Sequence, residues 1–213
     1  MHNKHNKNYM RLALITLTLV TSLRLASAQD KLPREEALKY AFLVSVDLKQ
    51  LQGTPIPTDV DVKQPVAIRD GEFGGMVLPE AKLTAEVIAK AGEKIVPIGQ
   101  VWLYKLTPMR DGEAVGSDKL RLAKVSNEGT EVQLPQCTLG VRRASGGGLE
   151  LVVLGKTTTP LVTVPLKAIE KAADGKEQAG IDMEAERDSA AGHITFKIVG
   201  KYQAKIDVTQ LEL

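Results

Sequence analysis

The 213-residue chain contains 28 basic and 26 acidic side chains, and 43% of its residues are hydrophobic. A hydrophobic fraction of this size is typical of a folded globular protein and excludes a wholly disordered one. The length allows one large hydrophobic core or two small ones.

The first 28 residues have the three parts of a secretory signal peptide. Basic residues precede an apolar run over residues 12–23, and a small A-x-A motif follows at residues 26–28. The run is too short to span a bilayer, which takes about 20 apolar residues in a helix. We therefore expect cleavage after Ala28 and export to the periplasm or the medium. Arg24 departs from the signal pattern, and an uncleaved interfacial anchor is the alternative.

Without this leader the chain is slightly acidic. The leader removes four basic residues and no acidic one, which leaves 24 basic and 26 acidic side chains. The four basic residues are Lys4, Lys7, Arg11 and Arg24. Nucleic-acid binding needs a concentrated basic surface, so we expect no nucleic-acid partner. No second apolar stretch follows the leader, so we also expect no integral membrane span after processing.

Cys137 is the only cysteine, so no disulfide can form within the chain. Exported domains that lack disulfides must be held together by buried apolar surface. A free cysteine usually packs as a small hydrophobic residue, so we expect Cys137 to be buried and inert.

The mature chain begins with a predicted helix and a predicted strand. Pro33 and the acidic residues after it favour a helix over residues 34–39, because acids stabilise the positive end of the helix dipole. Alternation of apolar and polar residues over 42–49 predicts a half-buried strand. The two prolines within residues 54–58 then interrupt any sheet ladder.

Turn residues divide the chain that follows. Asp70-Gly71 and nearby glycines between apolar runs predict a hairpin over residues 66–78. Residues 79–91 carry a helical pattern that ends at Gly92, and a hairpin that pairs 87–89 with 95–96 is the alternative.

Strands dominate the second half. A turn is expected at residues 109–112, and strands over 120–125 and 131–134 are expected on either side of another turn. Residues 167–173 favour a helical turn, and residues 174–192 read as a polar loop.

Three segments share a pattern of an apolar strand, a glycine and a long polar residue. They are residues 95–100, 151–156 and 196–201, and each precedes a second extended run. The pattern indicates an internal duplication of a β-meander, although the spacing is not constant and true repeats are usually strictly periodic. The alternative is that the three glycines reflect common turn and bulge chemistry.

Few residues carry the chemistry of a nucleophile or a metal site. His193 is the only histidine outside the leader, and Ser145 lies in no nucleophile elbow, so a surface histidine at a strand edge is expected. Gly155-Lys156-Thr157 resembles the end of a phosphate-binding loop, but Glu150 stands where that motif needs glycine. We therefore expect no nucleotide site there.

The acidic residues allow two further hypotheses. A cluster follows Gly180, and two aspartates flank Val60. These residues are Asp182, Glu184, Glu186 and Asp188 in the cluster, and Asp59 and Asp61 beside Val60. Calcium favours such oxygen-rich loops, but the EF-hand pattern is missing and a solvated acidic turn is the simpler interpretation. A catalytic pair of carboxylates would also be compatible with these residues.

Aromatic and arginine residues favour structural roles. Trp102 and Tyr104 share a strand face, and the apolar residues around them favour packing in the core over an exposed sugar-binding platform. Arg142 and Arg143 lie beside a glycine-rich turn, which is typical of a solvated hairpin tip.

These observations predict a mostly β protein of antiparallel, β-sandwich-like sheets with one or two short helices. Strands around 95–106 and 149–166 should be central, and residues 29–213 form one domain or two halves that meet near 112–118. No catalytic, cofactor-binding or metal-binding residue is assigned. The expected function is that of an exported, non-enzymatic binding or structural module of unknown ligand, for which another exported protein is one possible partner. A carboxylate-based hydrolase and a calcium-stabilised module are the alternatives.

Overall fold

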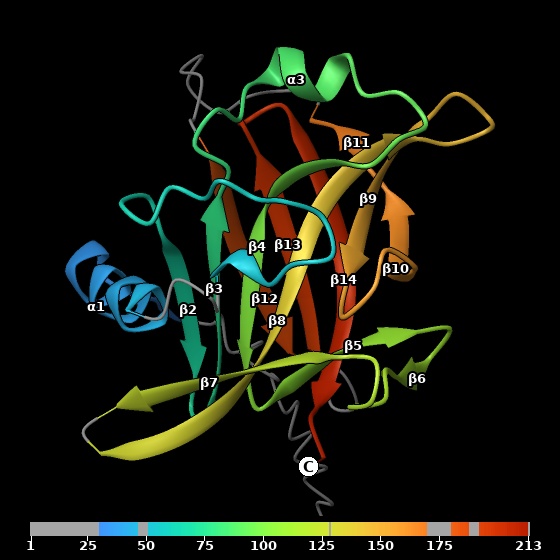
Figure 1. Cartoon of the computed structure of the whole chain (residues 1–213). Coiled ribbons are helices and arrows are strands. Elements are labelled where there is room, and N and C mark those ends of the chain that lie inside the picture. The colour runs from blue at the N-terminus through green and yellow to red at the C-terminus, as the bar shows by residue number, and fades with distance from the viewer. Residues whose placement is uncertain (1–29, 47–50, 128, 170–179, 188–191, 213) are drawn as a thin grey trace, which may run out of the picture.

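The computed structural model describes residues 30–46, 51–127, 129–169, 180–187 and 192–212. Within these residues the chain forms two antiparallel sheets and two helices, which confirms the predicted mostly β, sandwich-like fold. Figure 1 shows the red strands of the second sheet behind the green and yellow strands of the first.

The first sheet contains, in spatial order, β1 (Asp30–Lys31), β2 (Val66–Asp70), β3 (Phe73–Pro79), β4 (Val96–Tyr104), β8 (Thr130–Arg143), β9 (Leu149–Leu154) and β10 (Pro160–Pro165), and β7 (Arg121–Asn127) also pairs with β8. The second sheet contains β12 (Ile181–Arg187), β13 (Gly192–Ile198), β14 (Tyr202–Gln210), β5 (Leu106–Arg110) and β6 (Glu113–Ala114), and β11 (Lys167–Ala168) also pairs with β14. The helices are α1 (Arg34–Ser45) and α3 (Ala85–Ala89).

The main hydrophobic core lies between the two sheets. Val101 and Leu103 of β4 face Phe196 of β13 and Ile206 of β14 in one buried cluster. Complete burial of side chains of this size stabilises a fold by about 1.5–3 kcal/mol each. Cys137 belongs to the same core, as predicted, and burial raises the pKa of its thiol to about 12. The thiol therefore stays protonated at neutral pH and supplies no reactive thiolate.

A second apolar cluster covers the outer face of the first sheet. Ala37, Ala41 and Val44 recur on one side of α1 and pack on a patch that includes Trp102 and Met76. Figure 1 shows α1 beside β2, and contacts join the helix to β2, β3 and β7. This spacing of four and three residues is that of a helix that buries one face.

The helix replaces the strand that was predicted over 42–49. α1 continues to Ser45, and residues 47–50 lie outside the described residues. Phe42 and Val46 belong to the alternating pattern that suggested a strand. In the structure both face solvent and are more than two-thirds exposed. Burial of Ala41 and Val44 against the sheet outweighs the local preference of the β-branched residues.

Three other predicted elements also differ. Residues 79–91 hold the end of β3 and the five-residue helix α3, whose Thr84 hydroxyl accepts a hydrogen bond from the Val87 N–H. The alternative hairpin over 87–96 does not form, because Val96 pairs with Val141 of β8. Residues 167–168 form strand β11, while 170–173 lie outside the described residues.

Two predicted turns are confirmed by their backbone angles. Gly71 has a φ of 56° between β2 and β3, and Asp111 and Gly112 have φ values of 55° and 82° between β5 and β6. Positive φ at such positions matches the twist of the paired strands in a tight hairpin. The strands expected around 120–125 and 131–134 also form, as β7 and β8.

Strand β4 is central in its sheet, as predicted, but β9 and β10 are not. β10 ends the first sheet, and β9 is its only neighbour. Leu151 and Val153 face the main core, while Val152 and Leu154 on the other face are also fully buried. Burial on both faces gives this near-edge strand the continuous apolar pattern of a central one.

The three glycines of the apparent repeat have different structural roles. Gly99 lies inside β4 at a break in register with β8, where a Cβ atom would be 2.5 Å from the Leu78 carbonyl oxygen. Gly155 follows β9 and passes too close to the Lys119 carbonyl oxygen for a side chain. Gly200 has a φ of 65° in the β13–β14 turn. Bulge and turn chemistry explains the shared pattern better than duplication does.

A chain of buried amides fixes the segment before β2 to the outer face of the sheet. Gln136 Nε2 donates to Gln100 Oε1 at 2.6 Å. Gln100 Nε2 in turn donates to the Leu51 carbonyl oxygen at 2.8 Å and to the Thr58 hydroxyl at 2.7 Å. Both glutamines are almost completely buried, so these hydrogen bonds replace those that water would make.

We predict that Gln100→Met lowers the free energy of unfolding by about 3 kcal/mol, because it leaves Gln136 Nε2 and the Leu51 carbonyl oxygen buried without their partner. The Thr58 hydroxyl is half-buried and keeps its contact with the Thr54 hydroxyl. Gln136→Met leaves only Gln100 Oε1 unpaired and should cost about 1 kcal/mol. Urea unfolding of both variants measures the difference. Equal losses would contradict the claim that Gln100 holds more buried polar groups than Gln136 does.

Candidate functional site

An apolar groove of about 330 Å³ opens on the outer face of the first sheet. Its walls come from α1, from the β2–β3 hairpin, and from the paired strands β7 and β8. Its floor comes from β3 and β4. A concave and mostly apolar site of this volume is the usual form of a small-molecule site.

Four aromatic residues line this groove, which we name the aromatic groove. They are Tyr40 of α1, Phe73 of β3, and Trp102 and Tyr104 of β4. The Phe73 ring is already engaged by Arg187 of β12, whose guanidinium carbon lies 5.2 Å from the ring centroid. Four of the seven aromatic residues that follow the predicted leader touch this one cavity. Aromatic rings provide large contact areas at a low cost in conformational entropy.

The two aromatics of β4 have different exposure although they share a face. Trp102 is 2% exposed, because α1 and β7 cover it, whereas Tyr104 at the end of the strand is 41% exposed. The expected packing of the pair in the core is therefore correct for Trp102 and wrong for Tyr104. Trp102 forms part of the floor, and Tyr104 forms part of the rim.

Gly74 keeps the groove open beside Tyr104. It is the direct cross-strand partner of Tyr104, and it carries no side chain on this face of β3. A Cβ atom there would lie 3.2 Å from the Ile68 carbonyl oxygen and 3.9 Å from the Tyr104 Cβ atom. The absence of a side chain therefore leaves the inner side of the Tyr104 residue accessible.

The charges of the groove occur in pairs. Arg69 lies 3.2 Å from Glu36 of α1, and Lys105 lies 2.6 Å from Glu72. The hydrogen bond and charge of Lys105 lower the pKa of the Glu72 carboxyl. The groove therefore presents aromatic surface with little net charge, which suits an uncharged ligand.

One polar atom of the floor has no partner. The indole Nε1 of Trp102 is buried and makes no hydrogen bond within the described part of the chain. A buried donor without a partner costs about 1–3 kcal/mol, so burial of Trp102 stabilises the fold by less than its apolar area alone would give.

The residues considered for nucleophilic chemistry lie outside the groove. His193 is on β13, and its Nδ1 lies 2.6 Å from Asp207 Oδ1 on the neighbouring strand. Ser145 is in the turn between β8 and β9. Neither residue lines the aromatic groove.

The acidic cluster is a strand rather than the expected loop. Residues 181–187 form β12, and the three described acids of the cluster share one face and pair with lysines. The pairs are Asp182 with Lys31, Glu184 with Lys197 at 2.5 Å, and Glu186 with Lys205 at 3.6 Å. Asp188 lies outside the described residues. Among the residues that the structure places, no three His, Cys, Asp or Glu side chains are grouped as a metal would need.

Asp59 and Asp61 hold the segment before β2 in place. Both carboxylate oxygens of Glu80 accept the Asp59 N–H, at 2.9 and 3.0 Å, and Asp61 Oδ1 accepts the Lys63 N–H. Burial raises the pKa of the Glu80 carboxyl, and the Asp59 charge also raises it, against the lowering effect of the backbone hydrogen bond. This is the nearest approach to a tuned pair of acids, and it lies outside the aromatic groove.

Arg143 is not the solvated hairpin tip that was expected. Its guanidinium donates to the carbonyl oxygens of Ala89, Ala91 and Gly147, at 3.0, 3.3 and 2.8 Å. A cation at the C-terminal end of a helix satisfies free carbonyl groups and opposes the helix dipole, so Arg143 attaches α3 to β8. Arg142 pairs with Glu150 at 3.0 Å.

Sequence reasoning found half of the aromatic groove. The spacing of Trp102 and Tyr104 identified a shared face, but nothing local connects these residues with Tyr40 or Phe73. A clue was present at Gly74, because a glycine inside an apolar strand often marks a close approach or an opening. No family model, curated protein or solved structure matches this chain, so the site rests on its own geometry.

Glu80→Gln should change how stability depends on pH. Because burial favours the protonated Glu80 carboxyl, the folded state binds more protons than the unfolded state just above the ordinary pKa of 4.5. The wild-type protein should therefore lose stability relative to Glu80→Gln as the pH rises through that window. Thermal melts of both proteins between pH 4 and pH 7 test this, and parallel curves would refute the raised pKa.

Proposed function

We propose that the chain is an exported, non-enzymatic binding module that holds an uncharged, ring-bearing ligand in the aromatic groove. The observation that carries the proposal is the meeting of Tyr40, Trp102 and Tyr104 around one apolar cavity. Export is supported by the leader pattern of residues 1–28 alone.

The size of the groove favours a small ligand over a folded partner. About 330 Å³ is at the lower end of the range for small-molecule sites, which corresponds to one or two rings. A stable protein interface instead needs about 800 Å² on each partner, much of it flat. The groove is concave and narrow in comparison.

The energetics of binding follow from the lining. Burial of an apolar ring gains about 25 cal/mol for each Å² removed from water, and each aromatic pair adds about 0.5–1.5 kcal/mol. The rim charges are already paired, so an uncharged ligand does not have to desolvate a free ion. The rigid sheet under the groove reduces the entropy that binding would cost.

The carboxylate-hydrolase alternative has weaker support. Its best candidates, Asp59 and Glu80, are engaged in fixing the segment before β2, and they line none of the described cavities. The calcium alternative would need the acids of β12, which lie along an extended strand beside lysines.

Binding can be followed through Trp102, because it is the only tryptophan. Titration with N-phenyl-1-naphthylamine, an uncharged ring-bearing probe, should quench the Trp102 emission and increase the emission of the probe. Tyr104→Ala removes one aromatic contact and should weaken binding by about 3- to 10-fold.

Phe42→Ala is the matched control for this titration. Phe42 is an exposed aromatic residue of α1 that lies outside the groove, so its removal should leave the affinity unchanged. Equal effects of the two substitutions, or no quenching of Trp102 at saturating probe, would contradict the proposed site.

A further inference from the structure

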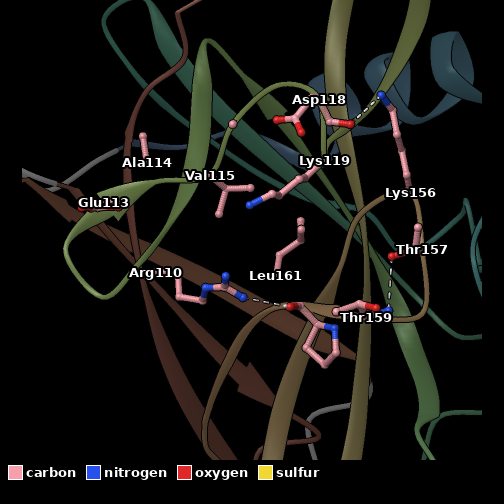
Figure 2. A pocket seen from close by; sticks show the side chains of 12 residues that line it. Arg110, Glu113, Ala114, Val115, Asp118, Lys119, Lys156, Thr157, Thr159 and Leu161 are labelled. Carbon is pink, nitrogen blue, oxygen red and sulfur yellow. Dashed lines mark hydrogen bonds between the residues drawn. The ribbon is translucent and has the colours of Figure 1, made fainter.

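A second, polar pocket of about 380 Å³ lies at the end of the molecule where β5 and β6 meet the loop between β9 and β10. Figure 2 shows its lining, which comes from the β5–β6 hairpin, the turn over residues 115–119 and the loop over residues 156–161. It shares no lining residue with the aromatic groove.

Three cationic side chains from three separate segments line this pocket. They are Arg110 of β5, Lys119 of the turn and Lys156 of the loop. In Figure 2, Lys119 extends into the space between Val115 and Leu161, and Arg110 approaches from the other side. Lys119 and Arg110 therefore reach the cavity from two sides, while the Lys156 ammonium is directed to the Asp118 backbone oxygen at its edge.

None of these cations forms an ion pair within the described part of the chain, although nine other ion pairs do occur there. Lys156 Nζ donates to the Asp118 backbone oxygen at 2.8 Å, and Arg110 donates to the Pro160 oxygen at 3.4 Å. These neutral acceptors orient the two side chains but do not neutralise their charge.

Two carboxylates also line the pocket, and they leave a net positive charge. Glu113 lies on β6, and Asp118 lies in the turn, where its Oδ1 would be 2.5 Å from a Cβ atom at Gly116. Asp118 is thus folded against its own turn. Three cations against two carboxylates leave one positive charge without a counter-charge.

The loop that follows β9 completes the chemistry of the pocket. Gly155-Lys156-Thr157 leads directly into strand β10, whereas a phosphate-binding loop leads into a helix. The Lys156 N–H donates to the Lys119 carbonyl oxygen at 3.1 Å, which joins the loop to the turn and brings the two lysines to one cavity. The hydroxyls of Thr157 and Thr159 add neutral hydrogen-bonding groups.

We propose that this pocket binds a small organic molecule that carries one oxyanion group, a phosphate, a sulfate or a carboxylate. Arg110 and Lys119 supply the charge-assisted hydrogen bonds that such a group prefers. The volume exceeds that of an oxyanion alone, and Val115 and Leu161 offer apolar wall for a carbon skeleton.

Calorimetric titration of the purified protein at constant ionic strength tests this proposal with four probes. Glucose 6-phosphate, glucose 6-sulfate and gluconate carry the three oxyanions, and glucose is the neutral control. At least one anionic probe should bind in a 1:1 ratio while glucose does not, and the strongest of the three identifies the oxyanion. If no anionic probe binds better than glucose, the proposal is wrong.

Substitutions then locate the binding. Lys119→Ala and Arg110→Ala should each weaken binding of the anionic probe by at least about tenfold, because each removes a hydrogen bond between charged groups. Both side chains are largely solvent-accessible, and a circular-dichroism melt verifies that each variant is folded. Lys82→Ala, an exposed lysine outside every described cavity, is the matched control. Equal affinity in wild type and both pocket variants would overturn the assignment.

Discussion

The structure depends on the burial of strand β4 on both of its faces. Val101 and Leu103 point into the core between the sheets, while Gln100 and Trp102 point to the opposite face and are also buried. A strand with one buried face needs only one layer of structure packed against it. β4 instead requires a second layer, which α1 and the segment near Thr58 provide.

That second layer is incomplete, and the aromatic groove is the part that remains open. The sandwich supplies a close-packed floor, since the main core lies directly beneath the first sheet. Above it, α1 covers Trp102 but not Tyr104, and Gly74 adds no side chain at the gap. The polar pocket is built differently, from turns at the end of the sheets, where charged side chains reach solvent.

Much of the fold was predictable from local patterns, whereas the site was predictable only in part. Turn chemistry located the hairpins at Gly71 and Gly112, where positive φ leaves few alternatives. Alternation gave the wrong element for α1, because its residues fit both a strand and a helix. Contacts with a sheet distant in sequence decide between the two. The polar-loop interpretation failed for β12, because its acids pair with lysines on other strands, and charge pairing between strands leaves no trace in a single segment. The groove joins Tyr40, Phe73 and Tyr104, which only the sheet order brings together.

The central claim is that the outer face of β4 is the ligand site. An amide ¹H–¹⁵N spectrum tests it directly, because Trp102 alone contributes an indole N–H signal. Addition of N-phenyl-1-naphthylamine should shift that signal together with the backbone amides of Gly74 and Tyr104, and should leave the amides of β13 and β14 unchanged. Shifts confined to β13 and β14, or an unmoved indole signal at saturation, would contradict the account.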